Sequence, residues 1–381
     1  MYPFGYWPTY RPNPKQHNRH KRNEMRARRI FYFKDDQYAD GQAFNFQPFG
    51  IKSYRYLKHI GAIIGEFPED MWAKQFEQQY KGMLYSEPDI QVKIGEPHVG
   101  QILKTSQGIP WGVERIDAHR AWPMTMGKGV KVAVIDTGIA FDHPALARNY
   151  RGGANILSPL FPPYDYNGHG THVAGTIGAR KNPTGVIGVA PRAHLYAVKA
   201  FNRKGSANLS DLLSAINWCI DNRMHVINMS FGMDKMSESL KRAIQKARHN
   251  GIIMVAAAGN QGSNGKLDFP ARYPETIAVT ATEKNNRLAS FSNTGRQVHL
   301  AAPGDKITSC WTNGGTRELS GTSMAVPHVV GTAALMLAMN PHLTSSDVDA
   351  ILSQSSTPLQ QTSTRRLGMV NAFSSVQMLK G

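Results

Sequence analysis

A serine at the start of a long apolar stretch is the first residue whose position suggests chemistry. Residues 319–337 read LSGTSMAVPHVVGTAALML, and Ser323 follows a Gly-Thr turn near the beginning of this stretch. A helix that begins there directs its free N–H groups and the positive end of its dipole at negative charge beside the hydroxyl. Ser323 is therefore the candidate nucleophile of an acyl-transfer site. A Gly-Thr-Ser cap on a buried helix would show the same pattern.

Three further polar groups supply what a serine nucleophile needs: a base, a carboxylate that orients the base, and a donor for the oxyanion. His169 stands between two glycines where a helix is expected to begin, so a substrate can approach its ring closely. Asp136 follows the apolar run 130–135, and N–H groups of the next turn can keep its carboxylate ionised. Asn260 ends the run VAAAGN (255–260) in a Gly-Asn turn. Each is alone an ordinary turn or cap residue, but their chemistry is complementary.

A metal site is the other reading of the histidines. His172 lies one helical turn after His169, so a two-histidine site has to be considered. The sequence contains neither the HExxH pattern nor the cysteine pairs of zinc sites. The pattern therefore favours a general base over a metal ligand.

Strands and helices that alternate after residue 107 provide the scaffold for these groups. We expect strands at 130–135, 194–200, 226–229, 252–256, 276–279 and 298–301, and helices at 171–179, 210–222, 237–250, 322–338 and 345–354. Such alternation predicts an α/β fold, a three-layer α/β/α sandwich with a parallel sheet. Ligands of such sheets gather at the carboxyl ends of the strands, where the four candidates stand.

The first 105 residues divide into two parts. Residues 1–45 are rich in basic residues and are expected to form a disordered, solvated arm, with binding to nucleic acid, cell wall or spore polymer as the alternative. Residues 46–105 are globular in pattern, with a strand at 62–65, a helix at 68–81 and a strand at 90–94. They predict a small α+β module of βαβ type, followed by an extended linker over 95–107.

Charge, cysteine content and hydropathy limit the classes of protein to which the chain can belong. The net charge of +17 is spread along all 381 residues and does not by itself indicate nucleic acid. Cys219 and Cys310 are the only cysteines in the sequence. This number excludes a framework of several disulfides but allows a single bridge between the two. No run of about 18 apolar residues indicates a membrane span. The first residues, MYPFGYW, lack a signal-peptide pattern, so we expect an intracellular or spore-associated protein, with secretion by another route as the alternative.

Four blocks together resemble the subtilisin-like serine peptidases, or subtilases, of bacterial subtilisin type. They are VIDTG (134–138), HGTHVAG (169–175), AAGN (257–260) and GTSMAVPH (321–328), and the resemblance covers about 270 residues. It implies that Ser323 attacks a peptide carbonyl, that His169 is the base and that Asp136 orients it. It also implies that Asn260 binds the oxyanion. The order Asp, His, Ser matches the family.

The resemblance further implies a substrate cleft. Its two walls would be residues 230–232 and 257–259, that is Ser230, Phe231, Gly232, Ala257, Ala258 and Gly259. Asp268 falls at the floor of the primary pocket by alignment, which favours Lys or Arg before the scissile bond. The alternative is that Asp268 points to solvent or pairs with Arg272.

A structural calcium ion is also implied by the family, but the ligand set is altered. Gln107 and Asn182 are similar to the amide ligands, whereas the carboxylate position is Ala145. Calcium prefers anionic oxygen, so we expect weak calcium binding or none, unless the nearby Asp142 substitutes. No cofactor is expected in the chemistry itself.

Residues 46–105 resemble the second part of a subtilase propeptide, which chaperones folding and inhibits the active site. Self-cleavage is then expected near Thr105 and Ser106, or after Lys104 if the basic preference holds. The sequence thus predicts a monomeric serine endopeptidase that is made as a self-processing precursor and acts on polypeptides, with esterase activity only as a side reaction. The alternative is a non-catalytic interaction protein that uses its basic arm.

Overall fold

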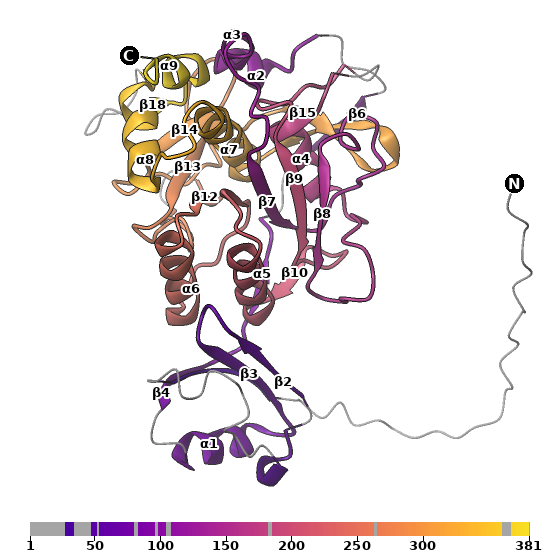
Figure 1. Ribbon diagram of the computed structural model, residues 1–381, viewed down its shortest axis with the longest axis vertical. Coiled ribbons are helices and arrows are strands. Elements are labelled where there is room, and N and C mark those ends of the chain that lie inside the picture. The colour runs from indigo at the N-terminus through magenta and orange to yellow at the C-terminus, as the bar shows by residue number, and fades with distance from the viewer. Residues whose placement is uncertain are drawn as a thin grey trace, which may run out of the picture.

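The computed structural model describes residues 27–33, 47–51, 53–79, 83–95, 98–103, 108–181, 185–262, 265–359 and 367–380. These residues form a large α/β domain and a smaller module below it in the view of Figure 1. The first 26 residues and residues 34–46, most of the expected arm, lie outside the described residues.

The central sheet confirms the expected α/β class. Among the described residues it has nine strands in the order β17-β18-β14-β13-β12-β11-β7-β9-β8. Neighbours pair in parallel except β17 with β18. The strands are β7 (Lys131–Asp136), β8 (Tyr150–Asn155), β9 (His194–Lys199), β11 (Val226–Met229), β12 (Ile253–Ala257), β13 (Ile277–Thr282), β14 (Leu300–Pro303), β17 (Thr357–Pro358) and β18 (Gly368–Met369).

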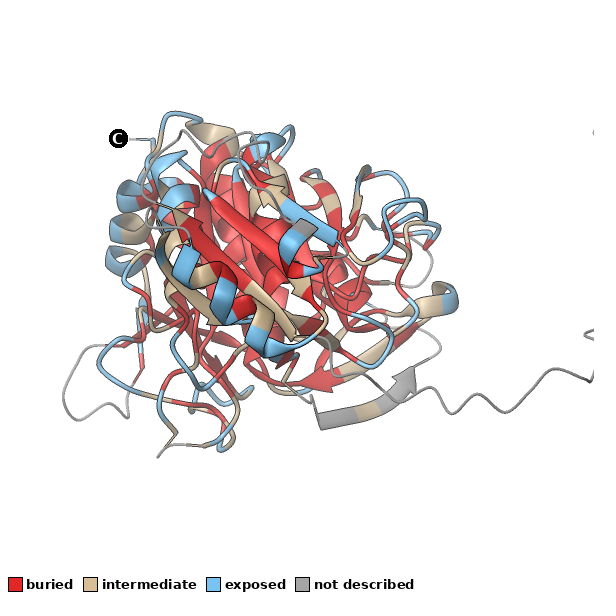
Figure 2. Ribbon diagram, turned by 90° about the horizontal axis from the view of Figure 1, so that it is seen from below, coloured by how far each residue is buried: buried red, intermediate tan, exposed pale blue. Residues whose placement is uncertain are grey.

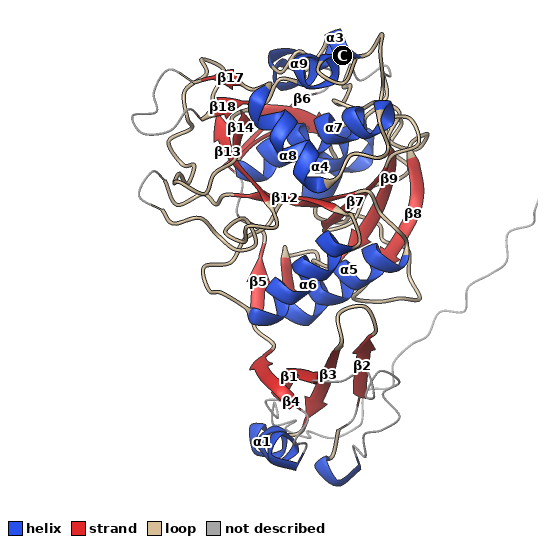
Figure 3. Ribbon diagram, turned by 60° about the vertical axis from the view of Figure 1, so that its left-hand side comes forward, coloured by secondary structure: helices blue, strands red, loops and turns tan. Residues whose placement is uncertain are grey.

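Helices cover both faces of the sheet (Figure 3). Alternate residues of β7 serve two cores: Val132 and Val134 pack on the face that α4 and α7 cover, while Ala133 and Ile135 pack on the face that α5 and α6 cover. The helices are α2 (Trp111–Arg115), α3 (Ala118–Ala121), α4 (His169–Gly178), α5 (Leu209–Asp221), α6 (Glu238–His249), α7 (Thr322–Met339), α8 (Ser345–Gln354) and α9 (Ala372–Gln377).

Helix α7 is the central helix of the domain and carries Ser323. Every residue from Thr322 to Leu337 is buried, and buried residues fill the middle of the molecule while the outer helix faces are exposed (Figure 2). Among the described helices α7 alone has the length and apolar composition to cross a membrane, but 89% of it is buried inside the protein. It is therefore a core helix.

The smaller module is an antiparallel sheet in the order β2-β3-β1-β4 with one helix. Both β3 and β4 pair antiparallel with β1, so they run parallel to each other, and β3, α1 and β4 form a βαβ unit that β1 splits. Its second strand is not the expected one at 90–94, because residues 91–93 pair outside this sheet. The elements of the module are β1 (Ala27–Phe33), η2 (Gln47–Phe49), β2 (Ser53–Leu57), β3 (Ala62–Phe67), α1 (Asp70–Gln79) and β4 (Met83–Pro88).

The expectation of a disordered arm up to residue 45 was wrong for residues 27–33, which form the strand β1. Ile30, Phe31 and Tyr32 are buried there, and the Phe31 ring lies 5.6 Å from that of Phe67 and 5.0 Å from that of Phe76. The short apolar run sits beside several basic residues, so composition concealed it. Its stability comes from strand partners about 30 to 60 residues away along the chain.

Two small sheets lie beside the central one. The expected strand at 90–94 belongs to one of them, but the sequence patterns predicted none of the other strands. β5 (Gln91–Lys93) pairs with β10 (Ser206–Asn208), and β16 (Thr316–Ser320) lies between β15 (Ile307–Cys310) and β6 (His98–Leu103). The stretch 95–107, expected as a plain linker, thus contains a strand. Cys219 and Cys310 are both buried and free, so no bridge joins them.

Candidate active site

Asp136 and His169 are joined at the carboxyl edge of the sheet. Asp136 ends β7 and His169 is the first residue of α4. The Nδ1 atom of His169 lies 2.8 and 2.9 Å from the two carboxylate oxygens of Asp136. The N–H of Thr137 donates to Asp136 Oδ1 at 2.7 Å. Because both side chains are buried, the ring is fixed in one orientation with Nε2 directed away from the carboxylate.

The first turn of α4 is held by Asp165, a buried residue that the sequence patterns did not single out. Its Oδ1 accepts from the N–H groups of Asn167 and Gly168, each at 2.9 Å. Its Oδ2 accepts from the N–H and the hydroxyl of Thr171, at 2.9 and 2.7 Å. An acidic residue four positions before a predicted helix start is the signal that could have found it. Asp165 therefore sets the position of His169.

Lys199 is a second buried charge that was missed. It ends β9, the strand beside β7, and its Nζ donates to the carbonyl of Thr137, next to Asp136. Burial lowers the pKa of Lys199, while the carboxylates of Asp165 and Asp136 oppose that shift. A lysine ending an otherwise apolar strand, in register with Asp136, was the available signal.

The electrostatics suit a general base. Burial alone would lower the pKa of His169, but the charge and hydrogen bond of Asp136 outweigh it, with a further contribution from Asp165, so the pKa is raised. The His169 Nε2 atom is buried and has no hydrogen-bond partner among the described residues. The Nε2 atom can therefore accept a hydrogen bond that no described residue donates. A general base needs such a free acceptor to take a proton.

Ser323 is the second residue of α7, and its hydroxyl is not bonded to His169. It donates to the carbonyl of Ser230 at 2.9 Å, and the Ser230 hydroxyl in turn donates to the Ser323 carbonyl at 2.9 Å. The side chain of Asn228 donates to that same Ser230 hydroxyl at 2.8 Å. Helix α4 packs against α7, and each of the two helices carries one of these residues, His169 or Ser323, in its first turn. Rotation of the Ser323 hydroxyl away from Ser230 is needed before it can reach a base.

Asn260 is oriented by the residue that precedes the serine. Its Oδ1 accepts from the N–H and the hydroxyl of Thr322, both at 2.9 Å. This leaves the amide hydrogens to donate elsewhere. A Cβ atom built on Gly321 would lie 3.4 Å from Asn260 Nδ2. The amide donor therefore lies beside the turn that carries Ser323.

Asp268 lies between the two candidate cleft walls. A Cβ atom built on Gly232 would come within 2.5 Å of Asp268 Oδ2, and one built on Gly259 within 2.6 Å. Burial raises the pKa of Asp268, opposed by Gln261 and Arg272. Arg272 itself donates to the carbonyl of Leu267 and lies 4.5 Å from the Phe269 ring, and no ion pair with Asp268 is formed among the described residues.

The other wall residues contribute mainly backbone. Phe231 is buried against Phe201, with the ring centroids 5.2 Å apart, and Ala257 and Ala258 are buried too. Their main chains, rather than their side chains, are what a bound peptide would meet.

Comparison with known proteins accounts for the arrangement. Residues 127–370 match the family described as "Subtilase family". The chain belongs to the subtilases. It is 43% identical to the thermostable alkaline protease of Halalkalibacterium halodurans over 74% of this chain and 79% of that protein. It is 44% identical to subtilisin Savinase of Lederbergia lenta over 70% of this chain and 98% of Savinase. Against subtilisin E of Bacillus subtilis the identity is 43%, over 74% and 75%.

This subtilase is accordingly a serine endopeptidase, and the expected family, fold and enzyme class are confirmed. Because the match covers nearly all of Savinase but 70% of this chain, the subtilase also carries residues that Savinase lacks. The location expected from the sequence has to be corrected. The relatives are secreted extracellular subtilisins, so the expected intracellular or spore-associated location is wrong. That inference rested on the composition of the first residues alone, which lie outside the described part of the chain.

The second histidine of the subtilase has a structural role. His172 Nε2 lies 2.9 Å from the carbonyl of Ile307 and 3.1 Å from that of Arg317, which links α4 to the β15–β16 hairpin. Burial lowers the pKa of His172 to about 3, so the ring stays neutral. No group of three or more His, Cys, Asp or Glu side chains that could hold a metal occurs among the described residues.

One position of the calcium site that the family implies lies among the described residues. Ala145 is buried, its side chain carries no oxygen, and its carbonyl accepts from the N–H of Arg180 at 2.8 Å. The two amide candidates, Gln107 and Asn182, lie outside the described residues.

Proposed function

We propose that this serine endopeptidase hydrolyses polypeptides with Asp136, His169 and Ser323 as its triad and with Asn260 and the Ser323 N–H as oxyanion donors. The Ser323 oxygen attacks the peptide carbonyl, and His169 Nε2 takes the hydroxyl proton and passes it to the leaving amine. Water then releases the acyl group. One observation carries the proposal: His169 Nδ1 lies within hydrogen-bond distance of both carboxylate oxygens of Asp136, and its buried Nε2 has no partner among the described residues.

Labelling with a serine-directed fluorophosphonate tests the nucleophile. We expect one label on the protein, at Ser323, with no label on Ser323→Ala or on protein that has been unfolded by heat first. His169→Ala is expected to label far more slowly, because the base is gone. If Ser323 stays unlabelled in the folded protein, the chain is an inert scaffold and the proposed triad is wrong.

We further propose that the smaller module is a propeptide that folds onto, and inhibits, the catalytic domain. Two carboxylates at the end of its sheet support this. Glu87 Oε1 accepts from the Ser237 hydroxyl and the Ser239 N–H, at 2.9 and 2.8 Å, at the start of α6. Asp89 accepts from the N–H and hydroxyl of Ser210, at 2.8 and 2.6 Å, in the first turn of α5. Both carboxylates lie at the positive ends of helix dipoles.

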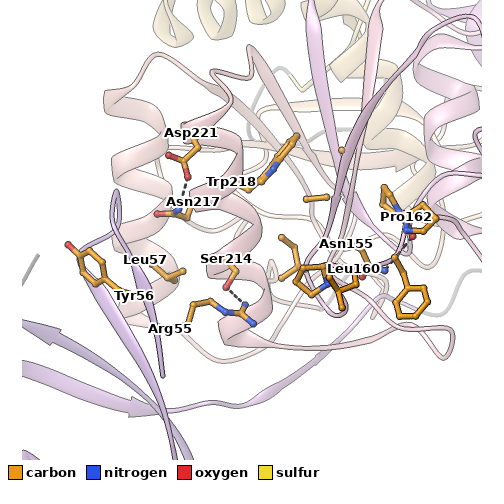
Figure 4. A pocket seen from close by; sticks show the side chains of 16 residues that line it. Arg55, Tyr56, Leu57, Asn155, Leu160, Pro162, Ser214, Asn217, Trp218 and Asp221 are labelled. Carbon is orange, nitrogen blue, oxygen red and sulfur yellow. Dashed lines mark hydrogen bonds between the residues drawn. The ribbon is translucent and has the colours of Figure 1, made fainter. Parts of the chain in front are cut away.

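The β2–β3 hairpin adds polar contacts with α5. Arg55 donates to the Ser214 hydroxyl at 2.8 Å, and the N–H of His59 donates to Asn217 at 3.0 Å. Arg55, Ser214 and Asn217 border a cavity of about 650 Å³ between the hairpin, α5 and the loop that bears Leu160 (Figure 4). The module therefore docks through two helix ends and one helix flank, and leaves a gap beside them.

The segment after the module supports inhibition by occupancy. β5 pairs antiparallel with β10 on one side, and Lys93 forms an antiparallel bridge with Gly232 on the other. The chain thus lies as a middle strand between β10 and the candidate cleft wall that contains Gly232, as a bound substrate would. Intact mass followed over time should show loss of the module from the wild-type protein and none from Ser323→Ala. Equal stability of both would remove the self-processing proposal.

The primary pocket is proposed to favour Lys or Arg. The support is the carboxylate of Asp268, which lies against both wall glycines, Gly232 and Gly259, where a cationic side chain entering between the walls would meet it.

A further inference from the structure

The chain passes through the catalytic cleft in a register that selects one peptide bond. Gln91, Val92 and Lys93 pair with Asn208, Ala207 and Ser206. The N–H of Ile94 then donates to the carbonyl of Gly205 at 3.0 Å. The paired segment therefore continues to Ile94, and the next carbonyl along the chain is that of Gly95.

Gly95 lies directly against the proposed oxyanion donor. A Cβ atom built on Gly95 would be 3.0 Å from Asn260 Nδ2. That amide cannot turn away without breaking the two bonds that its oxygen accepts from Thr322. Gly95 is thus the residue of this segment whose main chain lies at the proposed oxyanion donor.

Beyond the cleft the chain pairs with the strand that leads into the nucleophile. In β6, His98 and Val99 pair with Ser320 and Leu319 of β16, three and four residues before Ser323. One paired segment, β5, thus precedes Gly95, and the other, β6, begins at His98.

Resting on the proposed self-processing, we propose that the first cut follows Gly95, and that β6 afterwards stays on β16 as an N-terminal strand of the catalytic domain. The Ser323 oxygen forms a bond to the Gly95 carbonyl carbon, and the C–N bond to Glu96 breaks. His169 delivers the serine proton to the new Glu96 amine. Water then frees the Gly95 carboxylate and restores the serine. The cut lies about ten residues before the boundary that the alignment suggested.

The fit of β6 on β16 supports its retention. The pairing runs over six residues and is irregular between Arg317 and Leu319. There Gly100 faces Glu318 so closely that a Cβ atom would lie 2.8 Å from the Glu318 carboxylate and 3.1 Å from its backbone carbonyl. On its other edge β16 pairs with β15, so β6 covers an edge that would otherwise be open.

A glycine at the cut also explains how the site is selected. Glycine has no side chain to enter the pocket at Asp268, so docking of the module and the strand pairings must position this bond. A cut after Lys104 would instead depend on that pocket. The two mechanisms predict different effects of substitution.

The first test is the N-terminal sequence of the catalytic fragment at early times, with Gly95→Val and Thr105→Val as a matched pair. We expect a fragment that begins at Glu96. Gly95→Val should slow its formation at least about 100-fold, because a β-branched side chain displaces the locked amide, and Thr105→Val should leave the rate unchanged. A first fragment that begins at residues 105–107, blocked by Thr105→Val, overturns the inference and leaves self-processing intact.

Fluorophosphonate labelling distinguishes failure of the proposed cleavage from failure of the proposed triad. A wild-type protein that labels at Ser323 but is never cut overturns the register and the proposed self-processing and leaves the triad intact, whereas a protein that neither labels nor cuts overturns the proposed triad as well.

The second test is amide hydrogen exchange of the processed protein. We expect the amides of residues 99–103 to be protected roughly 100-fold over a free chain. Gly100→Val should remove most of that protection without slowing the first cut. Exchange of these amides at the free-chain rate in the processed wild-type protein would overturn the retention of β6.

Discussion

Replacement of Asp165 by asparagine tests how the base is positioned. The carboxylate accepts four hydrogen bonds, two at each oxygen. Asparagine retains one oxygen, so two donors lose their acceptor and face an NH₂ group instead. Hydrogen bonds to a charged group contribute about 1.5–3 kcal/mol each. The expected loss of unfolding free energy is therefore about 3 kcal/mol, which is two hydrogen bonds at the lower value of that range, because the turn can relax around the substitution.

The same substitution should change the pH profile. Asp165 contributes to the raised pKa of His169. Removal of that negative charge lowers the His169 pKa, so the protonated, inactive form appears only at lower pH. The acid limb of kcat/KM is therefore expected to move to lower pH in Asp165→Asn. A merely structural role would lower activity at every pH without moving the limb.

Urea unfolding of Asp165→Asn combined with Ser323→Ala measures the change in unfolding free energy without self-digestion. Peptide hydrolysis by Asp165→Asn with Ser323 intact measures the acid limb of kcat/KM. Asp142→Asn is the matched control: it lies on the surface, its one hydrogen bond among the described residues joins it to the Tyr164 hydroxyl at 3.3 Å, and its expected effect is below about 0.5 kcal/mol. If Asp165→Asn unfolds within about 0.5 kcal/mol of its parent and leaves the limb in place, the positioning argument is refuted.

Three other predictions follow from the site. The acid limb of kcat/KM in the wild-type protein should have its midpoint above 6.5, because Asp136 outweighs burial in setting the His169 pKa; a midpoint below that value contradicts the argument. Asp268→Ala should reduce the preference for Lys over Leu before the scissile bond by about 2 kcal/mol, roughly 30-fold, as measured by kcat/KM on paired peptides; an unchanged ratio means that the carboxylate does not reach the substrate. Chelation by EGTA should shift the thermal midpoint of Ser323→Ala by less than about 2 °C, whereas a fall above about 5 °C would show a bound stabilising calcium.

The candidate catalytic groups could be picked out from the sequence because their signals are local. Asp136, His169, Asn260 and Ser323 each stand where an apolar strand ends or a helix begins, and a parallel sheet brings strand ends to one edge. The alternation of strands and helices also predicts the sheet and its covering layers. Most expected elements lie within two residues of their bounds in the structure, since hydrophobic periodicity is set by near neighbours.

Strand β8 shows where that reasoning stops. It reads YRGGAN and has no alternation, yet it pairs with β9 at the edge of the sheet. The strands β1, β6 and β16 were missed for the same reason. Each is short, and each is stabilised by pairing with residues far along the chain rather than by its own composition.

By itself, then, the sequence determined which chemistry the chain carries, in what order along it, and on what class of scaffold. Only the tertiary structure decided that Asp165 holds the first turn before His169, that Asp268 lies between two glycines, and that the Ser323 hydroxyl rests on Ser230. It alone placed Gly95 at the Asn260 amide. These are contacts between segments tens to hundreds of residues apart, and their register depends on packing of the whole core, which no local pattern encodes.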